Sequence, residues 1–161
     1  MNKDEIQKVV HTLPISAGLF CIFVKLNQNI GIKIYPTKYS RDDVYKRQKK
    51  AAKLDLGPIT YGIVDIEYRG QKAYCYLTEI VETCTPSMYN LLHVKYLREE
   101  LLDKINFNFL DNHYKNCGIK NEKLICIDFG ENDSDYILID EKFGVYRDMT
   151  NEYLEDNIKY V

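Results

Sequence analysis

The sequence predicts an α+β fold in which a five-stranded antiparallel part with one helix precedes a mainly helical part. Short apolar runs bounded by turn residues recur between residues 17 and 81, a pattern typical of strands. Apolar residues spaced three and four apart from Ser87 to Leu102 are typical of a long amphipathic helix. A chain of 161 residues is long enough for a sound core and is expected to form one domain.

The first strands are expected at residues 17–26 and 30–35, because the turn residues 27–29 separate two apolar runs and Pro36 ends the second. A helix should follow over residues 41–54. Ser40 is suited to begin it, and Asp42 and Asp43 favour its positive end. Gly57 and Pro58 then mark its end.

The remaining elements follow from the same signals. Two strands joined by Arg69-Gly70 are expected near residues 59–68 and 72–81, followed by the long helix over 86–106 and a hairpin within 111–130. A strand or two near residues 135–146 and a short helix near 150–158 complete the prediction.

Composition excludes several classes of function. The net charge of −2 argues against a general nucleic-acid binder, and no apolar run reaches the length of a membrane span. The N-terminus lacks the apolar segment of a signal peptide. The five cysteines show no C-x-x-C spacing and are expected to be reduced and buried, in a cytoplasmic protein of the producing cell or of an infected host.

Three polar residues in the second half of the chain indicate chemistry. Asp128 follows the apolar strand 123–127, Asn116 begins the expected turn 116–122, and Asp111 lies five residues before Asn116. A carboxylate and an amide that leave one strand pair suit a divalent metal, which prefers oxygen ligands. Asp111 could then orient a hydroxyl, so the set predicts phosphoryl transfer from a nucleotide–magnesium complex.

This stretch resembles the catalytic segment of the protein-kinase-like superfamily, whose pattern is H-R-D-x-x-x-x-N followed by D-F-G. Asp111 and Asn116 have the required spacing, and Asp128 begins an Asp-Phe-Gly sequence. His113 matches the D-x-H-x-x-N variant of small-molecule and atypical kinases. Phe109 and Leu110 stand where the family has His and Arg.

The resemblance covers roughly residues 13 to 131 and implies further site residues. Lys33 would be the phosphate-pairing lysine of the V-A-I-K strand, and Gly18 would belong to the phosphate-covering loop. Thr78 would be the gatekeeper, and the backbones of Glu79 and Val81 would meet adenine. The implied architecture is one kinase-like domain over residues 1–161, with a small lobe and hinge at 13–82 and a truncated large lobe at 83–161.

Three departures from the family pattern bear on activity. Residues 16–20 offer one glycine where the family has three. The glutamate that pairs with the strand lysine has no clear counterpart: Gln48 lies near its place, with Asp42 and Asp43 nearer the helix start. The activation segment and the A-P-E motif are missing.

Each candidate also has a structural interpretation. Lys33 could lie on the wet face of a strand, while Asp128 and Asn116 could be turn residues. His113 is expected to brace the loop rather than react, and Lys115 is either a phosphate ligand or a surface lysine. The basic cluster is either a solvated helix face or a site for a phosphate or an acidic partner, with the first expected; its members are Lys46, Arg47, Lys49, Lys50 and Lys53.

Two main hypotheses follow. In the first, the chain is a minimal kinase with ATP and Mg²⁺ as cofactors: Lys33 pairs the phosphates, Asn116 and Asp128 hold the metal, and Asp111 receives the proton of a hydroxyl, expected on a protein. In the second, it is a pseudokinase that uses the same fold as a protein-binding module. A third interpretation is a kinase fold that needs a partner protein. Whether bound magnesium–ATP leads to transfer separates the first two.

Overall fold

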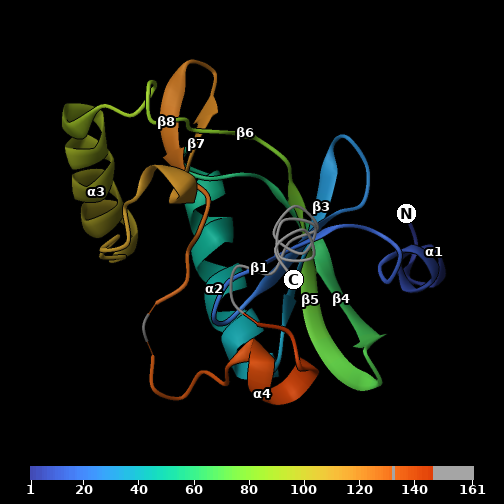
Figure 1. Ribbon diagram of the computed structural model, residues 1–161. Coiled ribbons are helices and arrows are strands. Elements are labelled where there is room, and N and C mark those ends of the chain that lie inside the picture. The colour runs from blue at the N-terminus through green and yellow to red at the C-terminus, as the bar shows by residue number, and fades with distance from the viewer. Residues whose placement is uncertain (132, 147–161) are drawn as a thin grey trace, which may run out of the picture. The chain divides into compact units, whose positions relative to one another are not determined.

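The computed structural model describes residues 1–131 and 133–146, and these form an α+β structure (Figure 1). The elements in chain order are α1 (Lys3–Val9), β1 (Ile15–Ala17), β2 (Ile22–Lys25), β3 (Ile30–Tyr35), α2 (Lys38–Ala52), β4 (Thr60–Tyr68), β5 (Gln71–Glu79), β6 (Glu82–Thr83), α3 (Leu91–Ile105), the 3₁₀ turn η1 (Tyr114–Asn116), β7 (Cys117–Lys120), β8 (Lys123–Cys126) and α4 (Ile139–Phe143).

The chain divides into two compact units, neither of which is one continuous segment. Unit 1 contains Met1–Asp42, Tyr61–Thr78 and the described residues after 132, whereas unit 2 contains Asp43–Thr60 and Glu79–Glu131. This grouping by contacts differs from a single boundary near residue 82, because residues 43–60 belong with the second unit and residues from 133 on belong with the first.

Unit 1 is built on the five-stranded antiparallel sheet that the sequence predicted, in the order β1-β2-β3-β5-β4. The expected strand over residues 17–26 is interrupted, however. β1 and β2 pair as a hairpin with Ala17 opposite Ile22. Between them the Gly18 N–H donates to the Cys21 carbonyl at 2.9 Å. The apolar run hides this turn, because Leu19 and Phe20 keep its composition strand-like.

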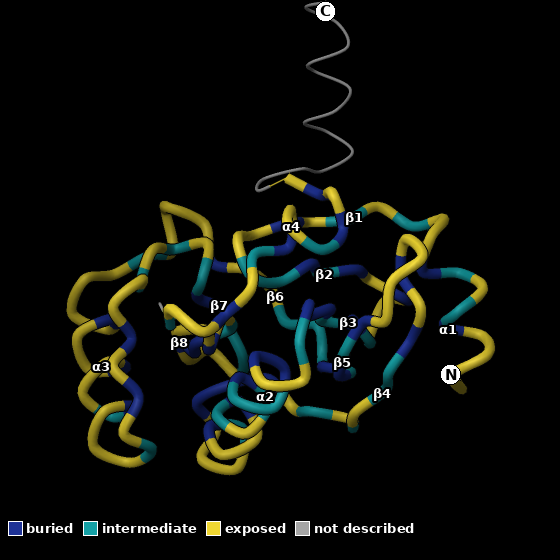
Figure 2. The backbone as a smooth tube through the Cα atoms, turned by 90° about the horizontal axis from the view of Figure 1, so that it is seen from below, coloured by how far each residue is buried: buried dark blue, intermediate teal, exposed yellow. Residues whose placement is uncertain are grey.

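The core of unit 1 gathers side chains from distant parts of the chain. Strand residues such as Ile22 and Ile34 are fully buried together with residues of α1 and α4 (Figure 2). The sequence did not predict α1, although Asn2 is its N-cap and accepts the Glu5 N–H at 2.9 Å. Two acidic residues in its first turn and this cap were the available signals.

Helix α4 overturns the expectation of a strand near residues 135–146. Ile139 and Phe143 lie one helical turn apart and are both buried, and Gly144 ends the helix with φ 66°. That left-handed conformation is typical of a helix C-terminus. The Ile139 N–H donates to the Leu19 carbonyl at 2.9 Å, which ties the helix start to the β1–β2 turn. The helix predicted near 150–158 lies outside the described residues.

Helix α2 begins at Lys38, three residues earlier than predicted. The Ser40 N–H donates to Thr37 Oγ1 at 3.2 Å, so Thr37 rather than Ser40 caps the helix. The helix ends at Ala52, and Asp55 follows with φ 57° in the turn before Gly57.

The predicted β4–β5 hairpin is confirmed, with Arg69 and Gly70 both at positive φ in its two-residue turn.

Unit 2 contains α3 and a three-stranded sheet in the order β6-β7-β8. Helix α3 begins at Leu91 rather than at residue 86, because the Asn90 side chain accepts the N–H groups of Leu92 and His93 as an N-cap. Its end near Asn106 is as predicted. The region after residue 82 was expected to be mainly helical with one hairpin. It also contains β6, which extends that hairpin to a three-stranded sheet.

The hairpin expected within residues 111–130 has longer strands than predicted. Residues 117–120, expected within the turn, form strand β7 and pair with β8. The turn is confined to Asn121 and Glu122, which have φ values of 52° and 63°. Non-glycine residues seldom adopt this conformation, but it matches the twist of a two-residue hairpin.

Candidate functional site

The β7–β8 hairpin places Asn116 beside the strand that leads to Asp128. Cys117 is opposite Cys126, and the Ile127 N–H donates to the Asn116 carbonyl at 2.9 Å. The hairpin pairing therefore reaches one residue beyond each strand. As a result, Asn116 and Asp128 both lie at the open end of the hairpin, whereas the sequence had placed Asn116 at the start of the turn.

The side-chain amide of Asn116 connects this end to Asp111. Its Nδ2 donates to the backbone carbonyl of Asp111 at 2.9 Å. Because this bond uses the amide nitrogen, Oδ1 is the Asn116 side-chain atom that can serve a cation. Asp111 itself is exposed. The bond to Asn116 runs through the Asp111 backbone, so the carboxylate is not the group that braces the loop here.

Asp128 is exposed and shapes its own turn. Its Oδ1 accepts the Gly130 N–H at 3.0 Å, and its carbonyl accepts the Cys126 thiol at 3.1 Å. The Asp128 carboxylate thus stabilises the turn and can also offer an oxygen to a cation. The turn interpretation of Asp128 and the metal-binding one are therefore compatible.

The loop between Asp111 and Asn116 is braced by its own residues. His113 Nδ1 accepts the Lys115 N–H at 3.4 Å at the start of η1, which is the bracing contact expected for this histidine. The Tyr89 hydroxyl donates to the Asn112 carbonyl at 2.8 Å. Lys115 is exposed.

The donor set at the hairpin fits Mg²⁺. An amide oxygen and a carboxylate are hard ligands, and magnesium is commonly held by one or two such protein groups together with water and substrate phosphates. Among the described residues, no group of three or more His, Cys, Asp or Glu side chains could hold a metal ion.

Three cysteines lie in the same hairpin or next to it. Cys84, Cys117 and Cys126 are all buried, and the Cys84 N–H donates to the Cys117 carbonyl at 3.0 Å. Burial raises the pKa of Cys117 to about 12, and the neighbouring Cys84 adds to this. The thiol therefore stays protonated at neutral pH, in agreement with the expected buried, reduced cysteines. Cys21 is the partly exposed exception.

Lys33 lies on β3 in unit 1 and is half-buried. Its Nζ lies 5.7 Å from the centroid of the Tyr76 ring. Burial raises the pKa of the Tyr76 hydroxyl to about 12, although the charge of Lys33 acts in the opposite direction. Lys33 thus interacts with an aromatic ring, which differs from the acidic partner in the family pattern.

The residues considered near the place of the family glutamate make other contacts. Gln48 Nε2 donates to the Pro58 carbonyl at 3.1 Å. Asp42 accepts hydrogen bonds from Lys38 and Arg41 of its own helix. Asp43 pairs with Arg47 at 2.8 Å. These contacts join the three residues to groups other than Lys33.

The predicted nucleotide residues are divided between the units. Gly18 and Thr78 are in unit 1, where Thr78 is buried on β5. A Cβ at position 18 would lie 3.7 Å from the Cys21 carbonyl oxygen, so the fold does not require glycine there. Glu79 and Val81 are in unit 2, with Asp111, Asn116 and Asp128.

Glu79 has structural contacts on both its backbone and its side chain. Its N–H donates to the Ile59 carbonyl at 2.8 Å, so the adenine prediction for this residue concerns its carbonyl oxygen. Its carboxylate accepts the Ile59 N–H and pairs with Lys120 at 2.7 Å. These bonds fix the segment that precedes Val81.

Sequence reasoning missed one residue near the candidate site. Arg47 was assigned to a solvated helix face, but its side chain is 12% exposed. It contacts the backbone carbonyl of Phe129 in the Asp-Phe-Gly segment. A single arginine among lysines, four residues after Asp43, was the available signal, because arginine favours buried multidentate pairing.

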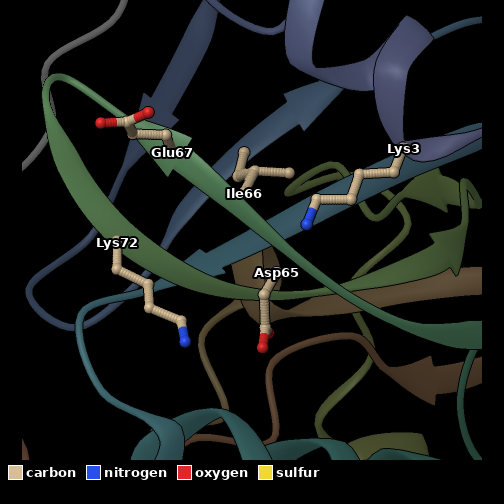
Figure 3. Close-up of a pocket in the computed structure, with 5 residues that line it drawn as sticks. All are labelled: Lys3, Asp65, Ile66, Glu67 and Lys72. Carbon is tan, nitrogen blue, oxygen red and sulfur yellow. The ribbon is translucent and has the colours of Figure 1, made fainter.

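A separate pocket of about 260 Å³ in unit 1 contains none of the predicted residues (Figure 3). Lys3 from α1 and Lys72 from β5 lie there with three residues of β4, Asp65, Ile66 and Glu67. Asp65 pairs with the buried Arg41 at 2.7 Å, so part of this lining serves the fold.

Comparison with known proteins gives no family assignment. No protein-family model matches the chain, and no curated protein matches it. Within the described part of the chain, no helix is long and apolar enough to cross a membrane.

Proposed function

We propose that this chain is a minimal kinase-like protein that binds ATP with Mg²⁺ and transfers phosphate to a hydroxyl group, expected on a protein. The observation that carries the proposal is the open end of the β7–β8 hairpin. There, Asn116 and Asp128 supply two oxygen donors, and the Asn116 amide holds the backbone of Asp111 at 2.9 Å.

Each residue has one role in this proposal. Asn116 Oδ1 and the Asp128 carboxylate hold the metal, which would neutralise phosphate charge when bound. Asp111 orients the acceptor hydroxyl and receives its proton, for which its exposed carboxylate is suited. Lys33 pairs the phosphates, and the Glu79 and Val81 backbones contact adenine.

The fold supports the same proposal at a coarser level. The five-stranded antiparallel sheet carries Lys33 on its third strand, and α2 lies between β3 and β4 in the chain. This arrangement fits the small lobe implied by the resemblance. Because one fold hosts many functions, the side chains of the hairpin carry more weight than the sheet.

A catalytically weak or inactive pseudokinase is the second candidate. The placement of Lys33 Nζ over the Tyr76 ring favours it, as do the other contacts made by Gln48 and Asp43. Such a protein would retain the fold and bind a partner protein.

Thermal melts and a transfer assay separate the candidates. The full chain is melted with ATP plus Mg²⁺, ATP plus EDTA, and Mg²⁺ alone, then incubated with labelled ATP and Mg²⁺ to detect autophosphorylation or hydrolysis. We expect the largest stabilisation with ATP plus Mg²⁺, together with transfer that Asp111→Asn removes. Stabilisation without transfer supports the pseudokinase, whereas no stabilisation by any nucleotide condition contradicts nucleotide binding.

A further inference from the structure

Arg47 reaches from α2 to the Asp-Phe-Gly segment within unit 2. Its guanidinium donates to the Phe129 carbonyl, pairs with Asp43 at 2.8 Å and lies 3.6 Å from a Glu131 carboxylate oxygen. The guanidinium carbon also lies 5.2 Å from the centroid of the Phe107 ring. One side chain thus contacts the helix, the segment and the aromatic core.

The bonded carbonyl belongs to the peptide group that joins Phe129 to Gly130. The N–H of that same peptide group donates to Asp128 Oδ1 at 3.0 Å. Arg47 therefore holds one end of a peptide plane whose other end binds the Asp128 carboxylate. If this peptide rotated, both hydrogen bonds would break and the carboxylate would lose its orientation.

The ring of Phe129 also fixes the segment. Phe129 is fully buried, and its ring centroid lies 5.7 Å from that of Phe107. A Cβ at Gly57 would come within 2.7 Å of the Phe129 ring, so the backbone of residue 57 packs closely against it. The ring sets the depth of the segment, but only a bond to the backbone sets the rotation of the peptide.

We infer that Arg47 is a positioning residue that orients Asp128 for metal binding through the Phe129–Gly130 peptide group. This inference rests on the proposed function of Asp128. Arginine is suited to the task because its planar guanidinium donates several hydrogen bonds in fixed directions and stacks on aromatic rings, whereas a lysine ammonium is a point charge. Arg47→Lys should therefore restore only part of the effect.

The test compares Arg47→Gln and Arg47→Lys with the control Lys50→Gln, which removes an exposed charge from the same helix. Hydrogen exchange of peptides covering residues 126–131 reports the local backbone without any ligand, with α3 peptides as the internal reference. A second measurement titrates Mg²⁺ at fixed ATP and compares the result with ATP binding in EDTA.

In Arg47→Gln we expect faster exchange confined to residues 126–131 and apparent Mg²⁺ affinity in the presence of ATP weakened about 10-fold to 100-fold, as is common when a group supporting a metal ligand is lost. ATP binding in EDTA should change less than about twofold, because Arg47 acts through the metal ligand. Arg47→Lys should be intermediate, and Lys50→Gln should behave as wild type.

The outcomes distinguish this inference from the proposed function. Unchanged exchange at 126–131, or faster exchange throughout unit 2, overturns the positioning role. Wild-type binding of magnesium–ATP with an unaltered Mg²⁺ requirement in Arg47→Gln overturns the inference alone. Wild-type protein that shows no Mg²⁺-dependent nucleotide binding overturns the proposed function, and the metal-orienting role falls with it.

Discussion

Two substitutions at Asp128 separate its turn from its charge. Asp128→Asn preserves an oxygen that can accept the Gly130 N–H, whereas Asp128→Ala removes that acceptor together with the carboxylate. Both substitutions remove the anionic ligand that Mg²⁺ prefers. A structural role therefore predicts a difference between the two variants, while a metal-binding role predicts that both lose the same property.

The magnitudes follow from the exposure of Asp128 and from the hydrogen bond that its side chain accepts from Gly130. Because the residue is exposed, Asp128→Asn should change the free energy of unfolding by less than about 0.5 kcal/mol. Asp128→Ala should cost about 1 kcal/mol for the lost bond, which lowers the melting temperature by roughly 2 to 4 °C in a chain of this size. Magnesium–ATP at about 100 times its dissociation constant would stabilise the wild type by about 2.7 kcal/mol.

The assay is a thermal melt of the three proteins with and without ATP plus Mg²⁺. Without ligand we expect Asp128→Asn to melt with the wild type and Asp128→Ala slightly below both. With ligand, only the wild type should gain the full shift in melting temperature. An Asp128→Asn protein that keeps the whole ligand-induced shift would refute the metal role, and one that melts as low as Asp128→Ala without ligand would refute the hydrogen-bond reasoning.

Three further predictions concern neighbouring groups. Phe129→Ala should lower the free energy of unfolding by about 3 to 5 kcal/mol, because a fully buried ring leaves a cavity, and chemical denaturation measures this loss. Asp111→Asn should reduce the transfer rate by about 10²-fold to 10⁴-fold while ATP affinity and melting temperature stay within error, because its backbone carbonyl holds Asn116. A strong fall in melting temperature would instead assign the carboxylate to the fold. Because burial raises the pKa of Tyr76 to about 12, the folded state binds the phenolic proton more tightly than the unfolded state. That stabilisation is complete below about pH 10 and is lost as pH rises towards about 12, so Tyr76→Phe should flatten the alkaline fall in unfolding free energy, and an equally steep fall in the variant would contradict this cause.

The parts of the fold that could be predicted are those set by local residues. The Arg69-Gly70 turn and the end of α3 at Asn106 follow from short-range backbone preferences, and the structure places both where the sequence indicated. The β1–β2 turn could not be predicted, because it lies inside a continuous apolar run. Helix α4 is five residues long, too short to show a period, and its position depends on burial in the distant sheet.

The candidate site shows the same division. That Asp111, Asn116 and Asp128 belong to one hairpin segment could be predicted, because they are close together in the sequence. The backbone carbonyl of Asp111 as partner of Asn116, and the contact of Arg47 with Phe129, depend on residues brought together by the fold. Sequence spacing predicts which side chains share a loop, but it does not show whether a side chain or a backbone atom makes the bond.

The dispersed core of unit 1 has a consequence for the order of folding during synthesis. Ile6 and Val10, near the beginning of the chain, share that core with Phe143 and Val145, near the end of the described residues. While only the strands have emerged from the ribosome, the face of the sheet that is buried in the folded protein stays exposed to water. It is covered once those last residues emerge. We therefore expect a chain truncated after residue 131 to expose apolar surface, bind hydrophobic dyes and require chaperones, whatever the state of the hairpin.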